Sequence, residues 1–297
     1  MPEELPPDRG EHSLLRARDW QHRPQLDRVC EWWRSYGAGL CALVGIGGAG
    51  KTAIADRFLQ LLPGVFPDNP RVPKDTSLPA PSRHRVFSFY NLPNPDEFFR
   101  DLADWLGLAP AEGVAQVSYQ RIVAALEAAR SRLLLVLDGL EKVQEDGSRD
   151  FFGRITDGRL RDLVIRSARG DLDGVYILLT TRFRLYDPRA EGCAYYYGVS
   201  VEELEPDTAV ALLRARGVRK GTDPDLRSLA EQNGFHAFSV DLIGGYIGTF
   251  CEGDPGLLGP DPHVPEPEPT EDPEVGRIRK QEQRFARIAR RYEETLR

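Results

Sequence analysis

One stretch, residues 40–52 with the sequence LCALVGIGGAGKT, constrains the fold more than any other part of this 297-residue chain. It begins with an apolar run of strand character and continues into a segment rich in glycine. From Ala53 to Leu62 apolar residues follow at helical spacing. Residues 45–52 fit the pattern G-x-x-x-x-G-K-[ST], in which a glycine-rich loop between a strand and a helix surrounds a phosphate chain. The stretch therefore predicts a site for nucleotide phosphates, and its strand-before, helix-after context disfavours the alternative of a chance glycine turn.

Each residue type in this loop supplies one part of the expected site. The glycines let the backbone bring its N–H groups close to the phosphates, and the following helix adds the positive end of its dipole. Lys51 brings a mobile positive charge for the β- and γ-phosphates, and Thr52 offers a hydroxyl to Mg²⁺. The residues predicted to bind the nucleotide here are Gly45, Gly47, Gly48, Ala49, Gly50, Lys51, Thr52 and Ala53.

A second apolar segment, residues 133–137, ends at Asp138. Five apolar residues in a row, without alternation, are typical of a parallel strand that is buried on both faces. A carboxylate at the end of such a strand can hold Mg²⁺ together with Thr52, directly or through water. Glu141 follows three residues later and could orient or deprotonate an attacking water, although a surface acid is the open alternative.

A third apolar strand, VYILLTTR at residues 175–182, ends with Arg182. In open parallel sheets ligands sit outside the carboxyl ends of the strands, so Arg182 is placed to sense a γ-phosphate. The alternative is a surface arginine in a salt bridge. The predicted catalytic residues are Lys51, Asp138, Glu141 and Arg182, and the predicted metal ligands are Thr52 and Asp138.

Two further strands, at residues 85–90 and 194–199, complete the expected sheet. Strands that alternate with helices predict an α/β fold, namely a three-layer P-loop NTPase with a five-stranded parallel sheet, followed by a small all-helical domain. The expected organisation is a disordered N-terminus at 1–12, a P-loop nucleotide-binding domain at 13–200 and a helical domain at 201–253. A linker rich in proline and acidic residues follows at 254–273, and then a helix at 274–297 that leads towards a missing downstream domain.

The composition excludes several classes of protein. A net charge of -7 gives no global sign of nucleic-acid binding, and the basic residues between 277 and 291 read as the solvated face of a helix with an apolar stripe. No apolar run approaches the roughly 20 residues that a membrane span needs. The cysteines, Cys30, Cys41, Cys193 and Cys251, lie far apart without metal-like spacing, which favours a reduced, cytoplasmic protein.

With these motifs in place, the chain resembles the STAND class of P-loop ATPases, close to the NB-ARC type and its bacterial members, over roughly residues 13–297. GIGGAGKT resembles that class's Walker A loop, LLLVLDGLE its Walker B strand, and ILLTTR its sensor strand. NGFHAFSVDLIGGYI is similar to the segment that closes over the nucleotide in that class, although Ala237 stands where many members carry proline. The resemblance implies that Arg18 and His236 contact the nucleotide.

What the resemblance implies is a slow ATPase that works as a switch with ATP, ADP and Mg²⁺. ADP would hold a closed monomer, and ATP would permit self-association of the full-length protein and activation of an effector, in bacterial defence or cell-death signalling. Sensor and effector domains would lie outside this chain. The composition predicts no membrane partner and disfavours a nucleic-acid partner for this segment. Two alternatives stay open: a nucleotide-operated transcription regulator with a downstream DNA-binding domain, and a P-loop kinase acting on a small molecule. A GTPase is disfavoured because the chain lacks an N/T-K-x-D motif.

Overall fold

The computed structural model describes residues 14, 19–66, 72–129, 131–146, 152–186, 193–266, 269 and 273–296. The chain forms two compact units. The first unit contains Leu14 and the described residues within 24–45 and 51–200. The second unit contains the described residues within 17–23, 46–50 and 201–297. The expected disordered segment at 1–12 and the predicted nucleotide contact Arg18 lie outside the described residues.

The first unit is built on a five-stranded parallel sheet, as the sequence predicted. Its strands are β1 (Gly39–Val44), β2 (Arg83–Ser88), β3 (Leu133–Asp138), β4 (Val175–Thr181) and β5 (Tyr196–Ser200). Their order is β2-β3-β4-β1-β5, and every neighbouring pair is parallel. All residues of β3 and β4 are buried, as expected for central strands of a sheet that is covered on both faces.

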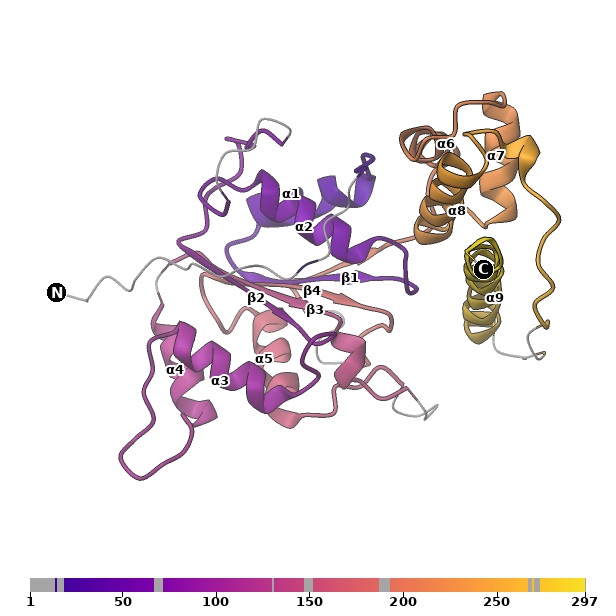
Figure 1. Cartoon of the computed structure of the whole chain (residues 1–297). Helices are drawn as coiled ribbons and strands as arrows, with labels where there is room; N and C mark the ends of the chain where they lie inside the picture. Colours follow the sequence, from indigo (N-terminus) through magenta and orange to yellow (C-terminus); the bar gives the residue numbers. More distant parts are fainter. Residues whose placement is uncertain are drawn as a thin grey trace. The chain divides into compact units, whose positions relative to one another are not determined.

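Helices cover both faces of this sheet (Figure 1). On one face lie α1 (Pro24–Ser35) and α2 (Lys51–Leu61), and on the other lie α3 (Pro95–Trp105), α4 (Tyr119–Ala128) and α5 (Gly158–Arg169). Local sequence explains several of their ends. The Asn94 side chain accepts from the Asp96 N–H at the start of α3, and the Asp157 side chain caps α5, which ends at Gly170 in the left-handed conformation. The result is the three-layer architecture of the P-loop NTPase fold.

The tryptophans of α1 belong to the core beneath this layer. Trp32 and Trp33 are fully buried, and the Trp33 ring lies 4.5 Å from the ring of Tyr176 in β4 and 5.9 Å from that of Phe58 in α2. These contacts bind α1 to the sheet and to α2, the helix that follows the phosphate loop. The helix begins at Pro24, whose fixed φ suits the first helical turn.

Strand β2 also differs from its prediction, since it spans Arg83–Ser88 instead of 85–90. The Phe89 N–H still donates to the Asp138 carbonyl at 2.8 Å, and the chain then turns through a bond from the Leu92 N–H to the Ser88 carbonyl. Tyr90 therefore lies in a turn just beyond the carboxyl end of the strand. This placement matters for the site described below.

The second unit contains the expected short helices, α6 (Pro206–Ala215), α7 (Asp223–Gln232) and α8 (Ala237–Phe250), and the long helix α9 (Pro273–Thr295). Apolar side chains of α6, α7 and α8 form one buried cluster, which Ile288 of α9 joins. Tyr292 of α9 also donates its hydroxyl to the Leu242 carbonyl in α8 at 3.0 Å. Helix α9 is thus packed on α8 within this unit.

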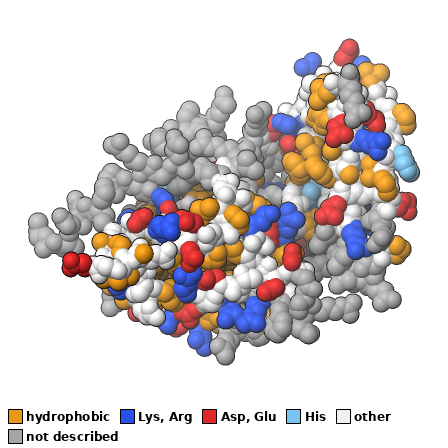
Figure 2. All heavy atoms as spheres, turned by 60° about the horizontal axis from the view of Figure 1, so that its bottom comes forward, with side chains coloured by type: hydrophobic (Ala, Val, Ile, Leu, Met, Phe, Trp, Pro, Cys, Tyr) orange, Lys and Arg blue, Asp and Glu red, His pale blue; other side chains and the backbone are white. Residues whose placement is uncertain are grey.

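The described surface has a mixed charge character. Acidic and basic side chains are interspersed over the face that Figure 2 shows. Among the described residues, no helix is both long enough and apolar enough to cross a membrane.

Candidate nucleotide site

Parallel pairing brings the ends of three strands to one edge of the sheet in the first unit. Val44 of β1 is in register with Thr181 of β4, and β3 pairs with the other side of β4. The Gly45 N–H, just after β1, donates to the Thr181 carbonyl at 3.2 Å. The start of α2, the end of β3 and the end of β4 therefore meet, and they carry the predicted catalytic residues.

Thr52 and Asp138, the predicted metal ligands, are in direct contact. The Thr52 hydroxyl donates to Asp138 Oδ1 at 2.8 Å, and the Thr180 hydroxyl donates to the same oxygen at 2.7 Å. Thr180 in turn accepts the Gly139 N–H at 2.9 Å, so it fixes the orientation of the carboxylate. Sequence reasoning passed over Thr180, although it is the first threonine of the TTR end of β4.

This pair of oxygens suits a magnesium ion. Mg²⁺ prefers hard oxygen ligands, and in phosphoryl-transfer sites it is held by one or two protein groups while phosphate and water complete its shell. Burial raises the pKa of Asp138, and the bonds from Thr180 and Thr52 act in the opposite direction. A divalent cation would compensate the cost of burying this carboxylate.

Lys51 lies at the first position of α2 with only 5% of its surface exposed. Its Nζ donates to the Gly45 carbonyl at 2.7 Å. Burial lowers its pKa from 10.5 to about 8, against the opposing effect of Glu141. A cation with so little water around it is well placed to neutralise a phosphate anion.

Glu141 is buried, which contradicts the alternative of a surface acid. It lies in the 3-10 turn η1 (Leu140–Val143), which Gly139 begins with a left-handed φ of 77°. Only 5% of its side chain is exposed, and Arg182 Nε lies 3.1 Å from its Oε1. Its other oxygen, Oε2, is buried and has no hydrogen-bond partner in the described part of the chain. A buried carboxylate oxygen of this kind requires an explanation, and acceptance of a hydrogen bond from a water is one.

Tyr90 is a residue of this cluster that the sequence did not reveal. Its hydroxyl donates to Glu141 Oε1, the same oxygen that faces Arg182. Burial, followed by the neighbouring Glu141 carboxylate, raises the pKa of Tyr90, so it remains a hydrogen-bond donor at neutral pH. The sequence feature that could have revealed Tyr90 is its position just after β2, because β2 lies next to β3 and both strands end at the same edge of the sheet.

Arg182 joins the cluster from the end of β4. Its side chain is 42% exposed, and it pairs with Glu141 rather than projecting freely. Both earlier interpretations of this residue, a γ-phosphate sensor and an arginine in a salt bridge, remain compatible with this position. Its role toward a nucleotide stays a prediction.

The glycine loop itself is held from outside by three contacts within the second unit. His236 Nε2 lies 2.7 Å from the Gly47 carbonyl, the Phe238 N–H donates to the Gly48 carbonyl at 3.1 Å, and Arg23 Nη1 donates to the Ala49 carbonyl at 3.1 Å. In a planar trans peptide the N–H points away from the C=O of the same unit. Holding three successive carbonyls therefore fixes the directions of the next three N–H groups in the loop.

Arg23 precedes the loop in the sequence, and His236 follows it by almost 190 residues. His236 is 3% exposed and is the N-cap of α8, where its side chain accepts from the Ser239 N–H. It follows Phe235, which has a left-handed φ of 49°, so local strain accompanies this close approach. Arg23 is also buried, which lowers its pKa, and its second amino group donates to the Glu202 carbonyl at 2.8 Å. The sequence did not single out Arg23, whose signal was its position directly before the first helix.

Gly48 has to be glycine for two separate reasons. Its φ is +75°, and an added Cβ would lie 2.6 Å from His236 Cε1 and 2.9 Å from Phe238 Cβ. We expect Gly48→Ala to lower the free energy of unfolding by about 1–3 kcal/mol through strain and this clash, as measured by urea denaturation. Gly113→Ala is the matched control, because Gly113 has a φ of +76° and open space around its Cβ position. If both variants lose the same stability, the close packing at Gly48 has no energetic consequence.

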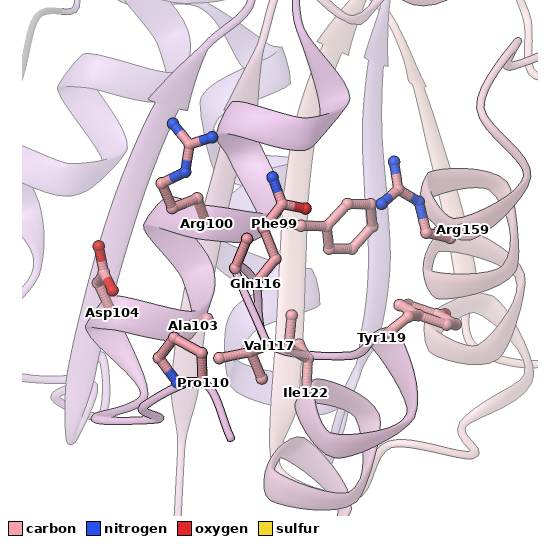
Figure 3. Close-up of a pocket in the computed structure, with 11 residues that line it drawn as sticks. Phe99, Arg100, Ala103, Asp104, Pro110, Gln116, Val117, Tyr119, Ile122 and Arg159 are labelled. Atoms are coloured by element: carbon pink, nitrogen blue, oxygen red, sulfur yellow. The ribbon is translucent and has the colours of Figure 1, made fainter. Parts of the chain in front are cut away.

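A hollow elsewhere in the first unit is separate from these residues (Figure 3). Side chains of α3, the segment 110–117 and α4 line it, together with Arg159 of α5, whose guanidinium lies over the Phe99 ring at 4.9 Å. None of the predicted site residues lines this hollow. It results from helix packing on one face of the sheet and does not belong to the strand ends where Lys51, Asp138 and Arg182 meet.

The sheet, the loop and the strand-end residues define the class, which is the P-loop NTPase fold. Residues 34–179 match the family model described as an AAA domain. This part of the chain is therefore an AAA-type P-loop ATPase domain. A search of the curated proteins finds no match.

Several solved structures are similar to this chain at low identity. One is a STAND protein with a tetratricopeptide repeat sensor from Pyrococcus horikoshii (17% identity, TM-score 0.48, covering 78% of this chain and 31% of that chain). A second is the ORC1 protein of Aeropyrum pernix in complex with DNA (17% identity, TM-score 0.46, covering 75% of this chain and 59% of that chain). A third is a Walker-type ATPase of Pyrococcus abyssi (14% identity, TM-score 0.48, covering 79% of this chain and 68% of that chain). This chain thus spans about a third of the length of the first structure.

Proposed function

We propose that this chain is a nucleotide-operated switch that binds ADP and ATP with Mg²⁺ and hydrolyses ATP slowly. The observation that supports this most directly is the contact between the Thr52 hydroxyl and the Asp138 carboxylate at 2.8 Å, at the strand ends beside Lys51. A phosphate loop, a buried lysine and a metal-binding oxygen pair are the parts that nucleotide binding requires. The match of residues 34–179 to an AAA domain supports the same function.

In this proposal each residue has a defined task. Thr52 and Asp138 would hold Mg²⁺, which would supply positive charge to neutralise the nucleotide phosphates. Lys51 binds the same phosphates, and Arg182 responds to the γ-phosphate from the end of β4. Glu141 accepts a hydrogen bond from the attacking water through Oε2, the buried oxygen that lacks a protein partner in the described part of the chain.

Slow turnover follows from the contacts of Glu141. Its Oε1 is already bonded by Tyr90 and Arg182, so the carboxylate and the arginine neutralise each other. Productive chemistry would require Arg182 to turn toward a γ-phosphate and Glu141 toward a water. A switch benefits from such a barrier, because its two nucleotide states must persist long enough for a partner to read them.

The partners of the switch follow from the resemblance noted in the sequence. Exchange of ADP for ATP would permit self-association of the full-length protein and activation of an effector, in a bacterial defence or cell-death pathway. A transcription regulator with a downstream DNA-binding domain is the second candidate, and it uses the same nucleotide chemistry. A small-molecule kinase is less well supported, since the carbonyls of residues 47–49 in the phosphate loop are held by His236, Phe238 and Arg23.

The experiment that tests this proposal is identification of the nucleotide carried by freshly purified protein. We expect ADP or ATP to be released on denaturation, and we expect the emptied protein to bind MgADP in calorimetric titration. Titration with MgGDP is the control, and it should show much weaker binding. Protein that carries no nucleotide and binds neither compound would refute the proposal.

A further inference from the structure

A chain of hydrogen bonds leads from α9 to the phosphate loop within the second unit. Gln281 Nε2 in α9 donates to Ser239 Oγ at 2.8 Å, Ser239 Oγ lies 3.1 Å from His236 Nδ1, and His236 Nε2 lies 2.7 Å from the Gly47 carbonyl. The three side chains are 8%, 0% and 3% exposed, in the same order. Little bulk water is available at these contacts, so each hydrogen bond depends on its protein partners.

The donor and acceptor groups determine the direction of every hydrogen bond in this series. A carbonyl only accepts, so His236 Nε2 carries the proton that Gly47 receives. His236 Nδ1 is then an acceptor, and it receives the Ser239 N–H at 3.4 Å together with the Ser239 hydroxyl. The hydroxyl oxygen of Ser239 accepts in turn from Gln281. The amide of Gln281 is oriented by Arg284, a pure donor that approaches Oε1 at 3.4 Å.

We propose that Gln281 and Ser239 are positioning residues for the phosphate loop, and that they act through His236. Donors aligned in one direction polarise each other, so the donor on α9 strengthens the bond that His236 gives to Gly47. That bond fixes the peptide between Gly47 and Gly48, and with it the direction of the Gly48 N–H. Docking of α9 on α8 thereby sets the geometry with which the loop receives a phosphate.

The rest of α9 shows how this geometry could be regulated. The helix is attached to α8 by Ile288 in the apolar cluster and by the Tyr292 hydroxyl on the Leu242 carbonyl. Any event that moves α9 away from α8 would remove the donor at Ser239 and weaken the hold on Gly47. This part of the inference rests on the proposed function, because it assumes that the loop binds a nucleotide.

The test compares two glutamines of the same helix. Gln281→Met removes the donor while keeping the length of the side chain, and Gln283→Met is the matched control, because Gln283 bonds the Pro265 carbonyl instead. We expect Gln281→Met to weaken MgADP binding about fivefold in calorimetry, the effect of one lost hydrogen bond. Proton–nitrogen NMR of the His236 ring should show the Nε2–H proton shifted upfield in this variant, because a weaker hydrogen bond to the Gly47 carbonyl shields that proton. The control should change neither quantity.

A second variant keeps the test valid if Gln281→Met does not fold. Gln281→Glu retains the shape but offers no donor, so it should change the affinity and the Nε2–H proton shift in the same direction. Weaker binding with an unchanged Nε2–H proton shift would show a merely structural role and overturn the proposal, as would a changed shift with unchanged affinity. If the wild-type chain binds no nucleotide, the proposed function fails by itself. The Nε2–H proton shift then decides whether Gln281 strengthens the hydrogen bond that His236 donates to Gly47.

Discussion

Lys51→Ala is expected to lower the affinity for MgADP and MgATP by about a hundredfold, as measured by calorimetric titration. The Nζ of Lys51 lies in a nearly water-free position, 2.7 Å from the Gly45 carbonyl, and its pKa is lowered to about 8. In such surroundings a charged hydrogen bond to a phosphate is strong, and removal of the cation leaves the phosphate charge without its partner.

Lys74→Ala is the matched control for this variant. Lys74 donates to the Gln60 carbonyl at 2.9 Å, in the last turn of the helix that Lys51 begins. It should leave nucleotide affinity unchanged. Because burial disfavours the charged form of Lys51 in the folded state, Lys51→Ala should not lower the melting temperature, which separates lost binding from lost folding. MgADP affinity equal to that of the wild type would contradict the assignment of the loop.

The sequence predicted those parts of the site that depend on a local pattern of residue types. The loop at 45–52 has a fixed spacing of glycine, lysine and threonine, and Asp138 and Arg182 end runs of apolar residues. Parallel strands place their ends at one edge, so the pattern also predicts that these residues meet. The five-stranded sheet followed from the same apolar runs, with errors of only a few residues at the ends of β2 and β5.

The residues that the sequence missed act through tertiary contacts. Thr180 is part of a strand that looks uniformly apolar and buried, yet its hydroxyl orients Asp138. Tyr90 was assigned to a strand, and only the turn after Ser88 carries its hydroxyl to Glu141. Arg23 holds a backbone carbonyl, and a carbonyl has no sequence signature of its own. The burial of Glu141 likewise depends on the 3-10 turn that Gly139 begins, and a short apolar pattern cannot predict that turn.

Glu141→Gln is expected to lower the rate of ATP hydrolysis by about a hundredfold, the contribution typical of a side chain that takes a proton from water. Glutamine keeps the size of the side chain and can still accept a hydrogen bond, but it is a far weaker base. Nucleotide affinity should remain close to that of the wild type, because Thr52, Asp138 and Lys51 are unchanged. Steady-state phosphate release measures the rate, and calorimetry measures the binding. An unchanged rate would exclude Glu141 as the residue that activates water.

Tyr90→Phe tests the same carboxylate from the opposite direction. Loss of the hydroxyl removes one of the two donors on Glu141 Oε1 and leaves the carboxylate freer to turn toward a water. We therefore expect the hydrolysis rate to rise several-fold while staying below the roughly 10 s⁻¹ of a median enzyme. Tyr119→Phe is the matched control, because its hydroxyl donates to a carboxylate of the same unit, that of Asp162, at 2.7 Å. If Tyr90→Phe slows hydrolysis as Glu141→Gln does, the tyrosine holds Glu141 in its productive orientation, and the slow rate must then arise from Arg182 alone.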